Sequence, residues 1–208
     1  MKAILGKKVG MTQVFDPDGK VVPVTVILAG PCWVVQKKTV AHDGYDALQV
    51  GFDPAKEKQV TKPRMGHFAK ANVKPLRILT EIRGPSELEQ GAQIKADIFA
   101  PGTVVDVVGK SKGRGFQGVV KRHKFSGGPA THGSKTGRIP GSVGASAWPS
   151  RVIKGKRLPG QMGNKQITVR NVVVVGTDVE QNLIWIRGAV PGARNSTVII
   201  REAKSGGK

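Results

Sequence analysis

The sequence predicts a mainly β protein, in which a body of short strands carries a long, basic, Gly- and Pro-rich extended loop. Three observations lead to this fold class. Short runs rich in Val and Ile, bounded by Gly, Pro, Asp or Asn, occupy both ends of the chain. Residues 107–177 contain 14 Lys or Arg and no Asp or Glu. Residues 109–165 hold 13 of the 28 glycines and, beyond one short run, almost no apolar periodicity.

The expected strands begin at the N-terminus. Residues 1–15 are typical of a strand and not of a targeting peptide, because Lys and Gly interrupt the apolar residues. The turn signal in residues 16–19, Asp-Pro-Asp-Gly, predicts a hairpin with the next run. Trp33 and Trp185 lie inside strand-like runs, so we expect them in the core. The further runs are 21–30, 33–40, 46–52, 103–109, 166–178, 182–190 and 196–203. Several short strands with such connections favour a barrel or a sandwich.

Three short helices are expected among these strands. One lies around residues 62–71, and Ser86 is a plausible N-cap for a second over 87–90. A third is predicted within the basic stretch, where the apolar or aromatic positions Phe116, Val119, Val120 and His123 have helical spacing.

The domain organisation follows from these elements. Residues 1–108 and 166–208 form the β-rich body, a barrel or a sandwich, with a small α+β insertion at about 60–100. Residues 109–165 form an extended arm that becomes ordered on its partner. Residues 204–208 form a flexible tail.

The charge of the chain indicates a polyanionic partner. With 34 Lys and Arg against 14 Asp and Glu, the formal net charge is +20. Outside residues 107–177 the balance is only 20 basic against 14 acidic residues. Like charges gathered in one segment repel one another unless something negative lies beside them. A membrane is not expected as that partner, because there is no run of eighteen apolar residues and Gly and Pro forbid an amphipathic helix in the arm.

Enzyme signatures are weak. Gly109, Lys110 and Ser111 match the end of a phosphate-binding loop, but Val104 stands where that motif needs its first glycine. The single cysteine, Cys32, cannot form an internal disulfide and fits a reducing cytoplasm. No catalytic residue, cofactor, small-molecule substrate or metal is expected, since the histidines lack ligands at metal-binding spacing; they are His42, His67, His123 and His132.

Folded RNA is the polyanion that fits best, because a flexible basic arm can follow irregular grooves and unstacked bases. Arginine suits bidentate phosphate contacts and lysine suits point neutralisation. The predicted RNA-contact residues are Lys110, Lys112, Arg114, Lys121, Arg122, His123, Lys124, Lys135, Arg138, Arg151, Lys154, Lys156 and Arg157.

Specific residues also carry a family resemblance. The run FAPGTVVDVVGKSKGRGFQGVVKR resembles the signature of the universal L-three family of large ribosomal subunit proteins, bacterial type. Three further runs are similar to sequences of that family and occur along the chain in the expected order. They are GKKVGMTQVF, GRIPGSVGAS and LPGQMGN. The matching residues of the signature are Phe99, Asp106, Gly109, Ser111, Gly113, Arg114, Gly115, Gly118 and Arg122.

The resemblance implies a β-barrel body at the outside of the large subunit and a loop that reaches toward the peptidyl transferase region. It implies binding to large-subunit ribosomal RNA of the 23S type, support of early subunit assembly in the cytoplasm, and the large-subunit proteins fourteen and nineteen as neighbours. Some relatives carry a methylated glutamine where this chain has Ala145, so that modification is not expected. The implied loop tip comprises Ala145, Ser146, Ala147, Trp148 and Pro149. The indole of Trp148 is not expected in the core and is expected to stack on RNA or to wedge into it.

Two other functions stay open on the residues alone. One is a nucleotide-dependent enzyme that uses residues 109–111. The other is a nucleic-acid packaging protein outside the ribosome.

Overall fold

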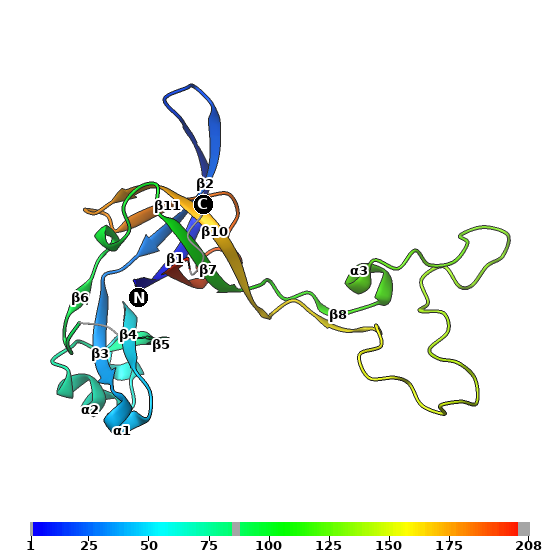
Figure 1. Cartoon of the computed structure of the whole chain (residues 1–208), viewed down its shortest axis with the longest axis horizontal. Coiled ribbons are helices and arrows are strands. Elements are labelled where there is room, and N and C mark those ends of the chain that lie inside the picture. Colours follow the sequence, from blue (N-terminus) through cyan, green and yellow to red (C-terminus); the bar gives the residue numbers. More distant parts are fainter. Residues whose placement is uncertain (1, 85–87, 204–208) are drawn as a thin grey trace. The chain divides into compact units, whose positions relative to one another are not determined.

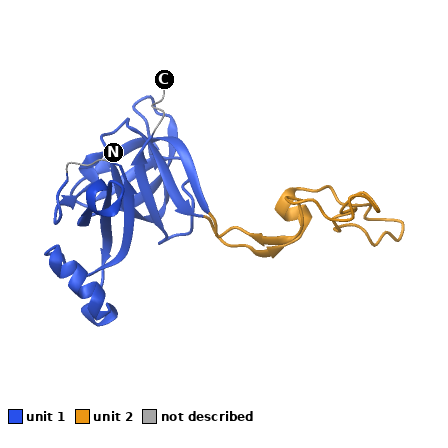
Figure 2. Ribbon diagram, turned by 60° about the horizontal axis from the view of Figure 1, so that its bottom comes forward, with its two compact units in different colours: residues 1–110, 166–208 blue, residues 111–165 orange. Residues whose placement is uncertain are grey.

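The computed structural model describes residues 2–84 and 88–203, and the chain divides into two compact units (Figure 2). Unit 1 comprises residues 1–110 and 166–208, and unit 2 comprises residues 111–165. The predicted tail and the predicted N-cap Ser86 lie outside the described residues. Of the helix expected after Ser86, the described residues 88–90 adopt no helical conformation.

Unit 1 is built around a closed β-barrel (Figure 1). Neighbouring strands are antiparallel throughout, and the barrel combines two strands from the start of the sequence, one from its middle and three from its end. Closure leaves none of these strands with an unpaired edge. The order around the barrel is β1 (Ala3–Phe15), β12 (Thr197–Glu202), β7 (Val104–Lys110), β10 (Gln166–Asp178), β11 (Leu183–Arg187) and β2 (Val21–Ala29), which returns to β1. The predicted mainly β fold is confirmed.

The predicted hairpin joins β1 to β2. Phe15 pairs with Val21 across the turn. The Asp16 N–H donates to the Lys20 carbonyl at 2.9 Å, and the Gly19 N–H donates to the Asp16 carbonyl at 2.8 Å. Every run predicted as a strand forms one, with ends that differ by no more than three residues.

Alternate residues of the barrel strands fill its interior. Ile184 and Ile186 of β11 and Val198 and Ile200 of β12 are fully buried. This spacing of two is what a sheet with one face in the core requires. The two tryptophans expected in the core are only half-buried: Trp33 packs at the edge of a second cluster around Phe68, and Trp185 lines a surface hollow.

Asp106 is a buried carboxylate within β7. Its Oδ1 accepts the Asn171 N–H at 3.1 Å, and its Oδ2 lies 3.5 Å from Arg201 Nη2. Asn171 has a φ of +55° and lies in the irregular stretch of β10 between Val169 and Val172. A buried charge needs such partners, so this signature residue fixes a bulge in the barrel wall.

A second sheet packs within unit 1 in the order β5, β4, β3, β6. Its strands are β5 (Leu76–Arg83), β4 (Ala47–Pro54), β3 (Cys32–Lys38) and β6 (Gln93–Ile94). The helix predicted around residues 62–71 is present as α2 (Lys62–Lys70), whereas β5 was not predicted. The remaining short helices of unit 1 are α1 (Val40–Asp43), η1 (Glu57–Gln59) and η2 (Ala96–Ile98).

Unit 2 contains little regular structure. β8 (Gly115–Gln117) pairs with β9 (Gly160–Met162), and α3 (Val119–His123) follows β8. The helix predicted here is therefore confirmed but is shorter than its apolar spacing suggested, because Phe116 belongs to β8.

Candidate nucleic-acid interface

Unit 2 begins and ends in a stem of backbone hydrogen bonds. The Ser111 N–H donates to the Lys165 carbonyl at 2.9 Å, and the Asn164 N–H donates to the Ser111 carbonyl at 3.2 Å. Gly163 has a φ of +73°, and a Cβ at this position would overlap the Lys112 carbonyl oxygen. Only glycine allows the two chain segments to approach so closely.

The stem continues into the ribbon of β8 and β9, where Phe116 lies opposite Gln161. The Arg114 N–H donates to the Met162 carbonyl at 2.9 Å. The ribbon therefore gives Arg114 and Phe116 a fixed backbone, while both side chains remain exposed. Phe116 is 76% exposed, so it is an aromatic ring without a core to fill.

α3 joins the two halves of unit 2 through its last turn. Arg122 Nη1 donates to the Leu158 carbonyl at 2.6 Å, and His123 Nε2 lies 3.1 Å from the same oxygen. Cations are favoured at this end of a helix because the last carbonyls carry partial negative charge. Arg122 and His123 therefore hold the fold of unit 2, whereas Lys121 and Lys124 remain exposed beside them.

Most of the predicted RNA-contact residues are exposed and have no acidic neighbour in their unit. Unit 2 contains twelve of the 34 Lys and Arg residues and none of the 14 Asp and Glu residues, so no ion pair with a side-chain carboxylate can form within it. Of the predicted contact residues, Arg122 and His123 are half-buried. The exposed predicted contacts are Lys110 in unit 1 and, in unit 2, Lys112, Arg114, Lys121, Lys124, Lys135, Arg138, Arg151, Lys154, Lys156 and Arg157.

Beyond α3, two chain segments of unit 2 pack through glycines. A Cβ at Gly127 would overlap the Gly137 carbonyl, and one at Gly128 would overlap Thr136. An open hollow of about 570 Å³ lies beside them, with Lys124 and the ring of Phe125 in its lining. A lysine ammonium and an aromatic ring are groups that bind phosphates and unstacked bases.

The predicted loop tip is a turn with almost no burial. Ala145, Ser146, Ala147 and Trp148 are exposed, and Pro149 is half-buried. The Trp148 side chain is 84% exposed, the most exposed large apolar side chain among the described residues. Hydroxyl groups close the turn: Ser142 Oγ donates to the Gly144 carbonyl at 2.8 Å, and Ser150 Oγ donates to the Ala147 carbonyl.

The segment that matched the end of a phosphate-binding loop is a strand end. Gly109 pairs with Ile167 of β10 and Val198 of β12, and Lys110 pairs with Gln166. Their backbone groups belong to the barrel ladder. A phosphate-binding loop needs free N–H groups between a strand and a helix, so this segment does not form one.

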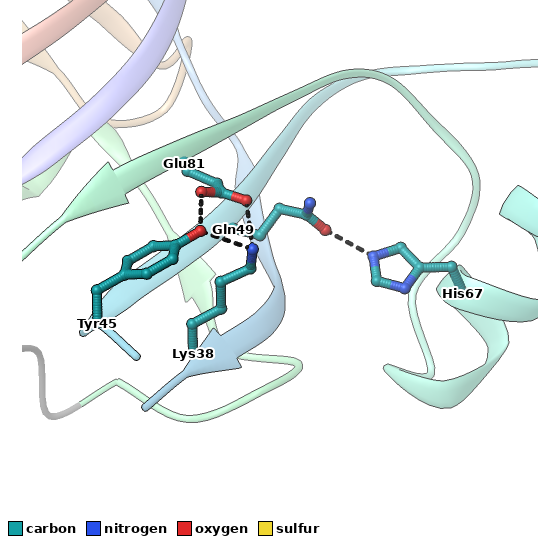
Figure 3. A network of polar contacts seen from close by, with 5 residues as sticks. All are labelled: Lys38, Tyr45, Gln49, His67 and Glu81. Carbon is teal, nitrogen blue, oxygen red and sulfur yellow. Dashed lines mark hydrogen bonds and ion pairs between the residues drawn. The ribbon is translucent and has the colours of Figure 1, made fainter. Parts of the chain in front are cut away.

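Neither a metal-ligand cluster nor a membrane-spanning helix is found among the described residues. No group of three or more His, Cys, Asp or Glu side chains there is arranged to hold a metal ion. No helix in the described ranges has the length and apolar character needed to cross a membrane. The His67 ring instead contacts Gln49 Oε1 at 2.6 Å (Figure 3).

One candidate contact escaped the sequence analysis. Phe116 was assigned to the apolar face of a helix, yet it is a strand residue with an exposed ring. The signal was present in its position, since Phe116 directly follows Gly113-Arg114-Gly115. An aromatic residue beside basic residues and glycines is typical of a base-stacking surface.

Comparisons with known proteins agree on one family. The family profile described as Ribosomal protein L3 matches residues 84–178. The chain is 56% identical to the large ribosomal subunit protein uL3 of Carboxydothermus hydrogenoformans over 99% of each chain. It is also 56% identical to the proteins of that name from Thermosipho africanus, over 99% of this chain and all of the relative, and Pelotomaculum thermopropionicum, over 97% of each. The predicted resemblance to a bacterial member is confirmed.

Proposed function

Because the chain belongs to the ribosomal protein L3 family, we propose that it is a non-catalytic structural protein of the large ribosomal subunit that binds the subunit's RNA directly. The observation that carries this proposal is the separation of charge. Unit 2 has twelve cationic residues without one carboxylate, and ten of the predicted contacts in it are exposed. The phosphates of an RNA would neutralise such a surface.

The mechanism that we propose is charge neutralisation on a glycine-rich backbone. Exposed Lys and Arg side chains of unit 2 neutralise phosphates of RNA segments that would otherwise repel one another. Glycine lets the backbone of unit 2 approach those segments closely. The barrel of unit 1 acts as an anchor. In this role the protein influences peptide-bond formation only through the RNA that it holds in place.

Two finer roles follow from the family and are proposals for this chain. The first is support of early large-subunit assembly. The second is a position of the tip, Ala145 to Pro149, near the peptidyl transferase region, with the exposed Trp148 ring stacked on or wedged into RNA. Large-subunit proteins fourteen and nineteen are the proposed neighbours, and the bacterial cytoplasm is the proposed location.

The direct test is binding to a fragment of large-subunit ribosomal RNA across a salt series, against an unrelated structured RNA of equal length. We expect a preference for the ribosomal fragment that persists at moderate salt. Affinity should fall by roughly 0.7–0.9 log units per neutralised phosphate per log unit of salt. Equal binding of both RNAs, removed equally by salt, would contradict the proposal and leave a general nucleic-acid packaging protein.

A further inference from the structure

A second concentration of positive charge lies in unit 1, outside the arm to which the sequence analysis assigned RNA binding. We call residues 55–75 the α2 excursion. It has six basic residues and a single acidic one, Glu57, whereas the rest of unit 1 has sixteen basic and thirteen acidic residues. The basic residues are Lys56, Lys58, Lys62, Arg64, Lys70 and Lys74, and all are exposed.

The α2 excursion has a defined structure. It connects β4 to β5, and the Ala55 N–H donates to the Pro75 carbonyl at 2.9 Å, which closes its base. One face of α2 is anchored: Phe68 is 1% exposed and belongs to a cluster with Val35 and Leu76. From the side of the helix, His67 points to Gln49 of β4 (Figure 3). The orientation of α2 on the sheet is thereby fixed.

The opposite face of α2 is formed by Lys62, Gly66 and Lys70. At 3.6 residues per turn, their spacing of four places them in one row on the side away from Phe68. All three are exposed. Neither the Lys62 nor the Lys70 ammonium takes part in an ion pair or hydrogen bond with any described residue. The helix also lacks an acidic residue in its first turn, where one would be favourable.

Gly66 is the second observation that points to a ligand. Glycine is less favourable in a helix interior than any residue except proline. A Cβ at Gly66 would meet nothing within 4 Å, so no contact inside the protein requires glycine there. What glycine provides at this position is close access of an outside molecule to the helix backbone.

We propose that the Lys62–Gly66–Lys70 face of α2 is a second RNA-binding site, at which the sugar–phosphate backbone of folded RNA lies across the helix. The two lysines are eight residues apart, or about 12 Å along the axis, so they contact different phosphates with Gly66 between them. The inference rests on the proposed function, which supplies the RNA. Binding through both units raises the effective concentration of each site for the other on the same RNA.

The charge is tested in the full chain with Lys62→Gln/Lys70→Gln against the matched control Lys20→Gln/Lys95→Gln, which removes two exposed lysines elsewhere in unit 1. In the salt series with the ribosomal RNA fragment, we expect Lys62→Gln/Lys70→Gln to lower the slope of log affinity against log salt concentration by about 1.4–1.8. The affinity at 0.1 M salt should fall by at least about tenfold. The control should keep the wild-type slope. An unchanged slope and affinity in Lys62→Gln/Lys70→Gln would overturn the proposal.

The close approach is tested with Gly66→Gln, which leaves the charge unchanged. Gln favours the helix more than Gly does, so the thermal midpoint should stay constant or rise. RNA affinity should fall several-fold with no change in salt slope, because the added side chain keeps the RNA away from the helix. Wild-type affinity in a folded Gly66→Gln variant contradicts the proposed contact.

Tethered cleavage locates the RNA directly. Cys32 is the single cysteine, it is fully buried, and burial raises the pKa of its thiol to about 12, so it resists labelling. An iron chelate on Ala69→Cys, at an exposed position one turn from Gly66, should therefore cleave bound ribosomal RNA at a discrete site, and one on Lys20→Cys should not cleave at that site. Absence of cleavage from Ala69→Cys overturns this inference alone if the wild type prefers the ribosomal fragment. If the wild type shows no such preference, the proposed function is overturned as well.

Discussion

Unit 1 and unit 2 are stabilised in different ways. Unit 1 has a continuous apolar core from the barrel to the second sheet, including Ile4, Val34 and Ile200. In unit 2, whose residues are all described, Val119 is the one buried hydrophobic residue. Unit 1 also contains both acidic and basic side chains, whereas unit 2 contains Lys and Arg but no Asp or Glu.

The difference shows how one chain can combine a stable body with a surface that depends on its partner. Burial of apolar area offsets the entropy of ordering unit 1. Unit 2 instead relies on backbone hydrogen bonds in its stem and on few apolar contacts, so most of its basic side chains stay exposed. Its stability as a folded element is therefore expected to increase with bound polyanion.

The largest expected effect comes from replacing residues 130–155 with a short Gly-Ser linker. This removes Lys135, Arg138, Arg151 and Lys154, so the salt slope of binding should fall by about 3 and the affinity at 0.1 M salt by about a thousandfold. Maturation of the large subunit in cells should be impaired. The thermal midpoint of unit 1 should not change, because its core is intact. Normal assembly, or an unfolded unit 1, would contradict the separation of the two units.

A pair of truncations should give opposite results in the two units. Ile200→Ala removes a fully buried side chain of the barrel and should lower the free energy of unfolding by about 2–5 kcal/mol. Trp148→Ala should change that free energy by less than about 0.5 kcal/mol, because the ring is exposed. Trp148→Ala should instead weaken RNA binding by about 1–3 kcal/mol through lost stacking. Denaturant unfolding and RNA titration of both variants provide the measurement.

Asp106→Ala tests whether this residue of the family signature stabilises the barrel without taking part in RNA binding. The Asn171 N–H and the Arg201 guanidinium would lose their buried acceptor, so the free energy of unfolding should fall by about 1–3 kcal/mol. The salt slope of RNA binding should remain that of the wild type. Asp18→Ala, at an exposed carboxylate, is the control and should be nearly neutral. A change in slope for Asp106→Ala would show that β7 contributes to the RNA surface.

The smallest expected effect is pH dependence from a surface network in unit 1 (Figure 3). Lys38 Nζ lies 2.7 Å from Glu81 Oε1, and the Tyr45 hydroxyl donates to Glu81 Oε2 at 2.9 Å. The hydrogen bond from Lys38, followed by that from Tyr45, lowers the pKa of Glu81, and the bond to Glu81 raises the pKa of Lys38.

Since the pKa of Glu81 is lower in the folded chain, its contribution to stability is present above about pH 4.5 and is lost as the pH falls through the folded pKa. The Lys38 contribution is present below the ordinary lysine pKa and is lost only as the pH rises through the raised value. Thermal unfolding of wild type and Glu81→Gln between pH 7 and 3 should show a small difference that shrinks toward pH 3. A difference that grows toward acid would refute this assignment.

Some features could be predicted locally and others could not. The hairpin at residues 16–19 was predictable because turn residues and strand runs are adjacent in sequence. β5 was missed, although Leu76, Ile78 and Ile82 alternate with polar residues in part of it. Phe116 was misassigned because its spacing to Val119 and Val120 fits a helix, whereas its pairing with Gln161 depends on a segment 45 residues away.

The sequence by itself determined the class of fold, the separation of charge and the family, because composition and motifs are properties of the chain order. Only the tertiary structure decided which of the charged residues are free. Arg122 and His123 share the Leu158 carbonyl, whereas Lys62 and Lys70 lie exposed around Gly66. A residue's partners are set by contacts between distant segments, and those contacts form only when the apolar faces of the strands and helices pack together.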